Sequence, residues 1–266
     1  MSNSNNKPPL HFFLGGRDAE MVRIAEILAE NGVPFSDAGL GWGAKASAYG
    51  AAIAEAASKG FVPVLVELEI DCDLPAGTVI VDHHGERSGD SASIIQVLNA
   101  IDVWPPSRWD HLIAVNDSEW FPGLIKFGAT PDEMKAVRAA DQAAQGIPPE
   151  KLAECERALA APAEFIGQVR VVRMSHSKTG PIGDALAIAA IAAGAKSPSE
   201  FPAYVVLSDD GEVNFSGDGA TAAALHDAFT GGWAGGAGLG NAEGSAYWGG
   251  YPPHDAVLMF LKERFG

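Results

Sequence analysis

The sequence is poor in cysteine, in positive charge and in long apolar runs, and each shortage excludes a class of protein. Its two cysteines, Cys72 and Cys155, form neither a disulfide framework nor a close-spaced metal motif, which favours a reducing cytoplasm. No apolar run reaches the length of a membrane span, and the polar segment 1–9 lacks the apolar core of a signal peptide. We therefore expect a cytoplasmic protein without a membrane partner.

The charge balance limits the kind of ligand. There are 18 Lys and Arg against 34 Asp and Glu, which gives a formal net charge of −16. A long nucleic acid is excluded as a partner, because neutralising many phosphates requires Lys and Arg. A short oligonucleotide or a small phosphorylated substrate held through a metal remains compatible with this charge. The sequence leaves the oligomeric state open, a homodimer included.

The 266 residues, 47% of them hydrophobic, are enough for one large or two modest domains. The first half alternates apolar strands with amphipathic or alanine-rich helices, which predicts an α/β fold with a doubly wound, mainly parallel sheet. A further helical stretch precedes the boundary that we expect at Ala161-Pro162, so the predicted domains are 1–160 and 161–266. The predicted strands of the first domain are 10–14, 61–68, 79–82 and 111–115, and its helices are 19–31, 44–58, 92–100 and 131–159, with a break at 146–149.

The second half predicts a smaller α/β domain. Its expected strands are 169–174 and 203–207, joined through a helix at 184–193. A turn at 209–211 predicts a hairpin with 213–215. A helix at 220–229 then leads into the glycine-rich stretch 231–238, whose backbone amides could approach a ligand closely. A flexible glycine loop over the core is the alternative. The stretch matches neither the P-loop nor the Rossmann fingerprint, and no nucleophile elbow is present.

The run 79–85 is the most informative stretch of the chain. An apolar strand ends abruptly in Asp82, His83 and His84. In open α/β sheets the ligand crevice lies outside the carboxyl ends of the strands. A carboxylate and two imidazoles there suit Mn²⁺, Zn²⁺ or Fe²⁺ better than Ca²⁺. The alternative is a polar turn in which one histidine bonds to the backbone.

These residues resemble a known family. Asp82-His83-His84 at a strand end, Asp117 farther on and the glycine-rich C-terminal stretch are similar to the DHH phosphoesterase superfamily with a C-terminal DHHA1-like domain. Its members include exopolyphosphatases, type II pyrophosphatases, single-strand exonucleases, and hydrolases of nanoRNA and cyclic dinucleotides. The resemblance covers most of the chain. It implies metal-dependent hydrolysis in an active-site cleft between the two domains.

The resemblance also implies a metal site. One ion of the family's pair would use Asp18, Glu67, His83 and Asp117, with Glu69 or Asp71 replacing Glu67 if the register shifts. Three carboxylates and one imidazole favour Mn²⁺, with Mg²⁺, Zn²⁺ or Fe²⁺ as alternatives. A single ion can still polarise a phosphoryl oxygen and lower the pKa of bound water.

The sequence departs from the family at two places. The His and first Asp expected after the first strand are replaced by Gly15, Gly16 and Arg17, so we expect one bound ion rather than two. Trp233 and Ala234 stand where the family has a histidine in its glycine motif. Arg17 could partly replace the lost positive charge, because guanidinium pairs well with phosphate.

The remaining candidates are catalytic or substrate-binding. We expect His84, beside the metal, to donate a proton or to contact phosphate. Asp82 is predicted to be catalytic together with His84. A purely structural role for His84 is the alternative. Arg87 and Lys178 could instead be exposed surface residues without a role in substrate binding. The predicted substrate-binding residues are Arg17, Arg87, Lys178, Gly231, Gly232, Gly235 and Gly236.

The sequence thus predicts a metal-dependent phosphohydrolase. The expected substrate is a phosphoester or phosphoanhydride in a small or short-chain compound, such as a short oligonucleotide, a dinucleotide or polyphosphate. The alternative is a catalytically diverged DHH-like protein that binds a nucleotide or phosphorylated ligand as a sensor or partner-binding module. A third option is a different metal-dependent chemistry on the same scaffold.

Overall fold

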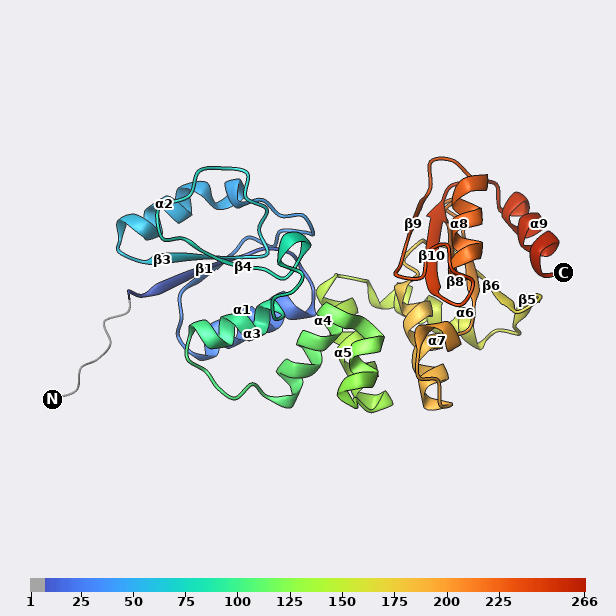
Figure 1. Cartoon of the computed structure of the whole chain (residues 1–266), viewed down its shortest axis with the longest axis horizontal. Helices are drawn as coiled ribbons and strands as arrows, with labels where there is room; N and C mark the ends of the chain where they lie inside the picture. The colour runs from blue at the N-terminus through green and yellow to red at the C-terminus, as the bar shows by residue number, and fades with distance from the viewer. Residues whose placement is uncertain (1–7) are drawn as a thin grey trace. The chain divides into compact units, whose positions relative to one another are not determined.

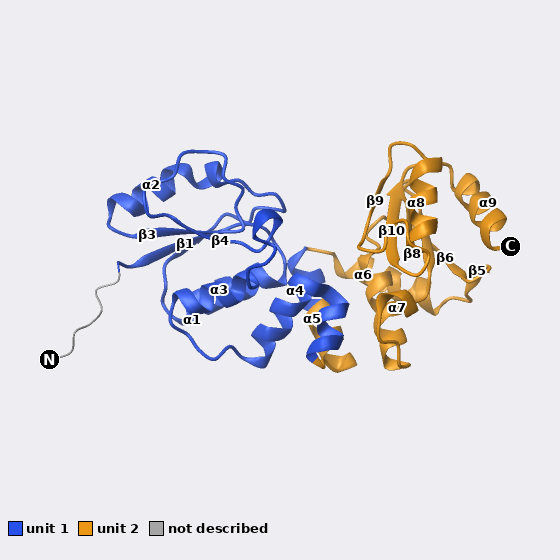
Figure 2. Ribbon diagram, in the orientation of Figure 1, with its two compact units in different colours: residues 1–127, 139–145 blue, residues 128–138, 146–266 orange. Residues whose placement is uncertain are grey.

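The computed structural model describes residues 8–266, so the polar N-terminal segment 1–7 lies outside the described residues. The chain divides into two compact units (Figure 2). Unit 1 comprises residues 1–127 and 139–145, and unit 2 comprises residues 128–138 and 146–266. The predicted boundary at 160/161 differs from this division, because helix α6 (Pro149–Ala160) packs on β6 (Val169–Met174) and α7 (Gly180–Ala192) of unit 2.

Unit 1 is built on a wholly parallel four-stranded sheet, in the order β2-β1-β3-β4. Its strands are buried and apolar at the centre, where Phe12, Phe13 and Leu14 of β1 are fully inaccessible. Strand β2 was not predicted, because only three residues form it. The strands are β1 (Leu10–Leu14), β2 (Phe35–Asp37), β3 (Val62–Val66) and β4 (Val79–Val81).

Helices cover both faces of this sheet, which confirms the doubly wound α/β prediction. Figure 1 shows α2 on one face and α1 with α3 on the other. The 3₁₀ turn 46–49 precedes α2, within the range predicted as one helix. The helices are α1 (Ala19–Glu30), α2 (Gly50–Ser58), α3 (Ser93–Ala100) and α4 (Arg108–Phe127), and short 3₁₀ helices are η1 (Ala46–Tyr49) and η2 (Gly85–Arg87).

The predicted strand 111–115 is wrong, because these residues lie in α4. A reciprocal cap begins that helix. The amide of Ser107 donates to Asp110 Oδ2 at 2.8 Å, and the amide of Asp110 donates to Ser107 Oγ at 3.1 Å. The apolar residues that follow are buried at helical spacing, from Leu112 to Leu124. The helix is interrupted at Trp120, whose φ is 51°.

Unit 2 contains a six-stranded mixed sheet in the order β5-β6-β7-β8-β10-β9. Only β6 and β7 pair in parallel; the predicted hairpin of β7 and β8 is confirmed. Strands β5, β9 and β10 were not predicted. The strands beside β6 are β5 (Glu164–Ile166), β7 (Tyr204–Ser208), β8 (Val213–Asp218), β9 (Trp233–Gly235) and β10 (Ser245–Gly250).

Residues of α8 and α9 pack with the sheet of unit 2 in a core that includes Phe215 and Trp248, and residues of α6 and α7 pack in a second core with Val172 and Val206. Helix α9 was not predicted, although its Val257 and Leu261 are fully buried in the first of these cores. Helix α5 belongs partly to each unit, since residues 139–145 group with unit 1. No helix among residues 8–266 is both long and apolar enough to cross a membrane. Beside α6 and α7, the helices are α5 (Pro131–Ala144), α8 (Gly219–Ala228), α9 (His254–Phe265) and the 3₁₀ helix η3 (Pro198–Glu200).

Candidate metal centre

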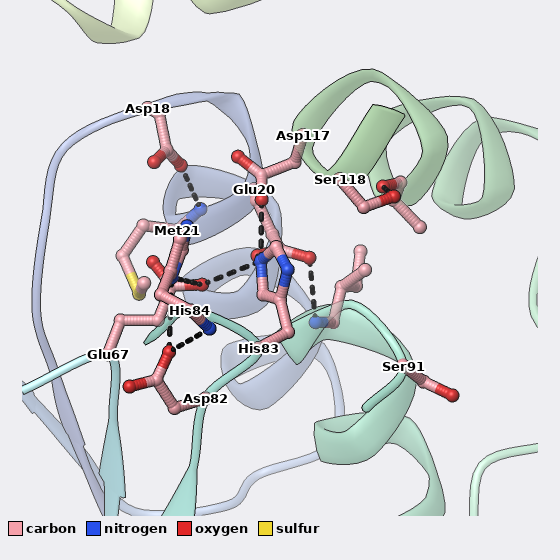
Figure 3. Close-up of polar contacts among 12 residues, drawn as sticks. Asp18, Glu20, Met21, Glu67, Asp82, His83, His84, Ser91, Asp117 and Ser118 are labelled. Carbon is pink, nitrogen blue, oxygen red and sulfur yellow. Dashed lines mark hydrogen bonds and ion pairs between the residues drawn. The ribbon is translucent and has the colours of Figure 1, made fainter. Parts of the chain in front are cut away.

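Several predicted site residues meet at one edge of the unit 1 sheet. Because the strands are parallel, the residues that follow β3 and β4 leave at the same end. Figure 3 shows Glu67, His83, His84 and Asp117 turned toward one another. Each offers one ligand atom, and these atoms all lie within 4.8 Å of one another. The structure therefore brings together three of the four predicted metal ligands and the predicted catalytic histidine.

His83 is the centre of this group. Its side chain is buried, and Asp117 on α4 reaches it although Asp117 does not follow a strand. The Nε2 atom of His83 is surrounded by three carboxylate oxygens. They are Asp117 Oδ2 at 2.7 Å, Glu67 Oε1 at 3.3 Å and Glu20 Oε2 at 3.5 Å.

Glu20 is a site residue that the sequence analysis missed. It lies in the first turn of α1 and is 1% exposed. Its Oε1 accepts the amide of Ile94 at 3.0 Å, which leaves Oε2 facing His83. A signal was present in the sequence: Glu20 shares the apolar stripe of α1 with Ile24 and Ile27. A carboxylate on the buried face of an amphipathic helix is uncommon unless it has a partner.

Four buried atoms of the group have no hydrogen-bond partner among the described residues: Glu20 Oε2, Glu67 Oε1, His83 Nε2 and Asp117 Oδ2. They lie close together, but their relative orientation does not meet the geometry of a hydrogen bond. Two ligands bonded to one ion at about 2.0–2.2 Å come to lie roughly 3 Å apart, which is close to the distances from His83 Nε2 to the three carboxylate oxygens. Three carboxylates around a single imidazole are costly to bury, and a divalent cation would offset that cost. Carboxylates and an imidazole gathered in this way could hold a divalent metal ion.

The backbone at Glu67 is held in an unusual conformation that points its carboxylate into the group. Its φ is 51°, in the left-handed region that non-glycine residues rarely adopt. The amide of Glu67 still donates to Val81 O at 2.9 Å, which fixes the residue to the end of β4. A Cβ added at Gly15 would collide with the carbonyl oxygen of Glu67. Glycine at position 15 is therefore a packing requirement.

The carboxylates determine the protonation of this cluster. The close carboxylates of Asp117, Glu20 and Glu67 raise the pKa of His83 to about 12 in the chain without metal. Burial raises the pKa of Glu20 well above its ordinary value. The metal-free cluster therefore holds protons that a divalent ion would displace.

His84 differs from His83 in exposure and in partners. Its side chain is 54% exposed, and its ring lies 4.2 Å from that of His83 between centroids. Asp82 Oδ1 accepts the amide of His84 at 2.9 Å and lies 3.1 Å from its Nδ1. In turn, Gln96 Nε2 donates to Asp82 O at 2.9 Å. Asp82 thus orients the imidazole and leaves Nε2 directed away from this contact.

Asp18 lies beside the group, but one of its carboxylate oxygens forms a helix-capping hydrogen bond instead. Its Oδ1 accepts the amide of Met21 at 2.8 Å and caps α1, as the sequence predicts. Burial, opposed by that hydrogen bond and assisted by the charges of Asp117 and Glu67, raises the pKa of Asp18 to about 6. Asp18 is not one of the residues whose ligand atoms converge, and its role as a metal ligand stays a prediction.

The alternatives to Glu67 face elsewhere. Asp71 accepts from both the amide and the hydroxyl of Ser47, and the carboxylate of Glu69 lies 3.9 Å from Lys45 Nζ. Both basic candidates of unit 1 are exposed: Arg17 in the loop before α1, and Arg87 at 3.8 Å from Asp90. Their contact with substrate stays a prediction.

The remaining predicted substrate residues belong to unit 2. Lys178 is exposed, and its amide donates to His176 Nδ1 at 3.2 Å. The glycine-rich stretch is only partly a loop, because it contains β9, which pairs with β10. Its glycines have packing roles there. A Cβ at Gly232 would meet Trp248, and one at Gly235 would collide with the hydroxyl of Tyr247, while Gly231 and Gly236 have positive φ.

Comparison with known proteins adds little to this geometry. No family model and no curated protein matches the chain. Among solved structures, the pGpG-specific phosphodiesterase PggH from Vibrio cholerae is similar at 11% identity and a TM-score of 0.39. The match covers 98% of this chain and 100% of that one. A likeness this distant carries no conclusion about what the chain does.

Proposed function

We propose that unit 1 is the catalytic unit of a metal-dependent phosphohydrolase. Its substrate would be a phosphoester or phosphoanhydride in a small or short-chain phosphorylated compound. The observation that carries this proposal is a set of four buried ligand atoms, His83 Nε2 and the three carboxylate oxygens around it, next to an exposed and oriented His84. The sequence resemblance to the DHH phosphoesterases supports the choice of phosphate chemistry.

Glu20, Glu67, His83 and Asp117 would hold the ion, and Mn²⁺ suits this donor set. An ion held there supplies Lewis-acid polarisation of a phosphoryl oxygen and acidification of a coordinated water. Without a cation the carboxylates would repel a phosphorylated substrate. A cation in the site would therefore favour the approach of an anionic substrate.

His84 and Asp82 would handle the proton and the substrate. Asp82 holds Nδ1 of His84, so Nε2 of the exposed ring can contact a phosphate oxygen or donate a proton to the leaving oxygen. Asp82 would also stabilise the imidazolium that donates this proton. The exposure of His84 suits a group that must meet substrate, whereas the burial of His83 suits a ligand.

A non-catalytic role is the second candidate. It is favoured by Gly15, where the backbone of Glu67 excludes any side chain that could hold a second ion. A chain with one ion could bind a nucleotide or another phosphorylated ligand without turning it over, as a sensor or partner-binding module.

The two candidates are separated by an activity panel with purified full-length chain. The substrates are pyrophosphate, polyphosphate, linear dinucleotides and a chromogenic phosphodiester, each tested with Mn²⁺ and with excess chelator. We expect Mn²⁺-dependent turnover of at least one substrate, and a loss of rate of roughly 10²–10⁴-fold in His84→Ala with its metal content unchanged. Binding of a phosphorylated ligand without turnover of any substrate in the panel would establish the non-catalytic role instead.

A further inference from the structure

The carboxylate of Asp141, on α5, reaches the start of α1, which lies 122 residues earlier in the chain. Its Oδ1 accepts the amide of Ala19 at 3.2 Å. Both residues are buried, and residues 139–145 belong with α1 to unit 1, so this contact lies within one compact unit. The first amide of a helix has no partner inside the helix, and one that is buried needs an acceptor from elsewhere in the fold. Asp141 supplies that acceptor.

The sequence of α5 places Asp141 on the buried side of that helix. A capping box begins α5, because the amide of Thr130 donates to Glu133 Oε2 at 2.8 Å and the amide of Glu133 donates to Thr130 Oγ1 at 3.2 Å. Met134 and Val137 are buried, and Asp141 follows them at helical spacing. A carboxylate on a buried apolar stripe is uncommon unless it has a partner.

The amide that Asp141 holds lies between two acidic residues, Asp18 and Glu20. Figure 3 shows both at the start of α1. Asp18 caps the helix through the amide of Met21, the third of the helix, while Asp141 holds the first amide, that of Ala19. The first turn of α1 is therefore fixed twice, once by its own cap and once from α5. A shift of this turn would displace the side chains on both sides of Ala19.

The carboxylate of Glu20 has little freedom to absorb such a shift. Its Oε1 accepts the amide of Ile94 at 3.0 Å, while Oε2 lies 3.5 Å from His83 Nε2. Metal–ligand distances are held within roughly ±0.2 Å in a well-formed site. A loosened first turn would therefore weaken the hold of Glu20 on an ion, even though every ligand is still present.

From these contacts we infer that Asp141 is a positioning residue of the metal centre. By holding the amide of Ala19, it fixes the first turn of α1 and, through that turn, the carboxylate of Glu20. The inference rests on the proposed function, because it takes Glu20 as a ligand of the ion. Asp141 acts through its hydrogen bond and not through its negative charge. Removing the bond and removing the charge therefore have different outcomes.

Asp141→Ala and Asp141→Asn separate the bond from the charge. Alanine removes the acceptor, whereas asparagine keeps an oxygen for the amide of Ala19 and removes the charge. Gln145 Nε2 donates to Asp141 Oδ2 at 2.9 Å, and the Gln145 amide can turn its oxygen toward the new NH₂ group of the asparagine.

Calorimetric titration of the chelator-treated full chain with Mn²⁺ measures the effect on the centre. Asp141→Ala should lower the Mn²⁺ affinity by about 10–100-fold, the usual cost of disturbing the groups that orient metal ligands. Asp141→Asn should bind Mn²⁺ as wild type does. Hydrogen exchange without metal gives a second readout, because the amides of residues 19–22 should exchange faster in Asp141→Ala than in wild type or Asp141→Asn.

Asp218→Ala is the matched control. Asp218 caps α8 of unit 2 through the amide of Thr221, so this variant also loses a carboxylate that caps a helix, but one that has no contact with α1. It should keep the Mn²⁺ affinity of wild type, and urea unfolding compares the stability of all the variants. An equal loss of affinity in Asp218→Ala would overturn the inference, because the effect would then follow stability and not position.

Wild-type Mn²⁺ affinity or unchanged hydrogen exchange in Asp141→Ala would also overturn the inference. So would an Asp141→Asn chain that loses Mn²⁺ affinity, whether or not Asp141→Ala folds. A wild-type chain that binds no Mn²⁺ would overturn the proposed metal centre itself and this inference with it. The failure of the proposed function is thus seen in wild type, and the failure of this inference alone is seen only in the variants.

Discussion

Glu20 has two contacts in the first turn of α1, and each depends on a different oxygen. Oε1 accepts the amide that begins α3, and Oε2 faces His83. The residue therefore links the packing of α1 and α3 to the metal centre. Changing its charge without changing its shape separates these two roles.

Glu20→Gln should lower the affinity for Mn²⁺ by at least 10–100-fold, the usual cost of disturbing the groups around a metal site. The amide oxygen can still accept from Ile94, so the secondary structure should be retained. Calorimetric titration with Mn²⁺ measures the affinity. Glu26→Gln is the matched control, because Glu26 lies on the exposed side of the same helix beside Arg23. Equal Mn²⁺ affinity in Glu20→Gln and wild type would remove Glu20 from the site.

Asp18→Asn should change how stability depends on pH. The raised pKa of about 6 means that the folded, metal-free chain favours the protonated Asp18. This contribution to stability is full below the ordinary value of 3.8 and is lost as the pH rises through about 6. Asparagine keeps the helix cap but does not titrate. Over that window the unfolding free energy of the variant should therefore fall less with rising pH than that of wild type.

Urea unfolding of chelator-treated protein at several pH values measures this difference. Asp218→Asn is the control, because Asp218 caps α8 through the amide of Thr221 at 2.8 Å and lies in unit 2. Parallel profiles for Asp18→Asn and wild type would contradict the assignment of the raised pKa to Asp18.

Among the secondary-structure elements, the ends of β1, β3 and β4 position the centre through close backbone contacts. The amide of Gly15 donates to Val66 O at 2.8 Å, and the amide of Glu67 donates to Val81 O at 2.9 Å. These bonds extend the parallel pairing one residue beyond the strands. They bring the carbonyl of Glu67 against the backbone at Gly15, where no Cβ fits.

Gly15→Ala should destabilise the chain by about 1–3 kcal/mol, the usual cost of overpacking, and should also weaken Mn²⁺ binding by displacing Glu67. Urea unfolding and calorimetric titration measure the two effects. Gly89→Ala is the control, because a Cβ there would meet nothing within 4 Å. A Gly15→Ala chain with wild-type stability and metal affinity would show that this contact does not position Glu67.

The ends of β1, β3 and β4 could be predicted from the sequence, but helix α4 could not. Apolar runs that stop at glycine or at polar residues indicate parallel strands, and β1, β3 and β4 follow that pattern. The run 111–115 has the same local appearance and is helical. Its cap, Ser107 with Asp110, was the signal that decides between the two. Short runs of apolar residues do not distinguish a buried strand from a buried helix.

In the whole molecule, tertiary contacts decide what local patterns leave open. His83 and Asp117 could be selected from a motif and its spacing, but Glu20 could not, because Ile94 and His83 are its partners only after folding. Likewise the glycine-rich sequence of unit 2 is typical of a loop. Only the pairing of β9 with β10 shows that its glycines avoid steric clashes. The doubly wound sheet could be predicted because its alternation is repeated along the chain.

The central claim is that one divalent ion binds around His83 and that His84 is not needed to hold it. Calorimetric titration of chelator-treated chain with Mn²⁺, compared among wild type, His83→Ala and His84→Ala, tests it most directly. We predict about one tight site per chain in wild type, no tight site in His83→Ala, and a retained site in His84→Ala. Tight binding in His83→Ala, or two tight sites in wild type, would contradict the account.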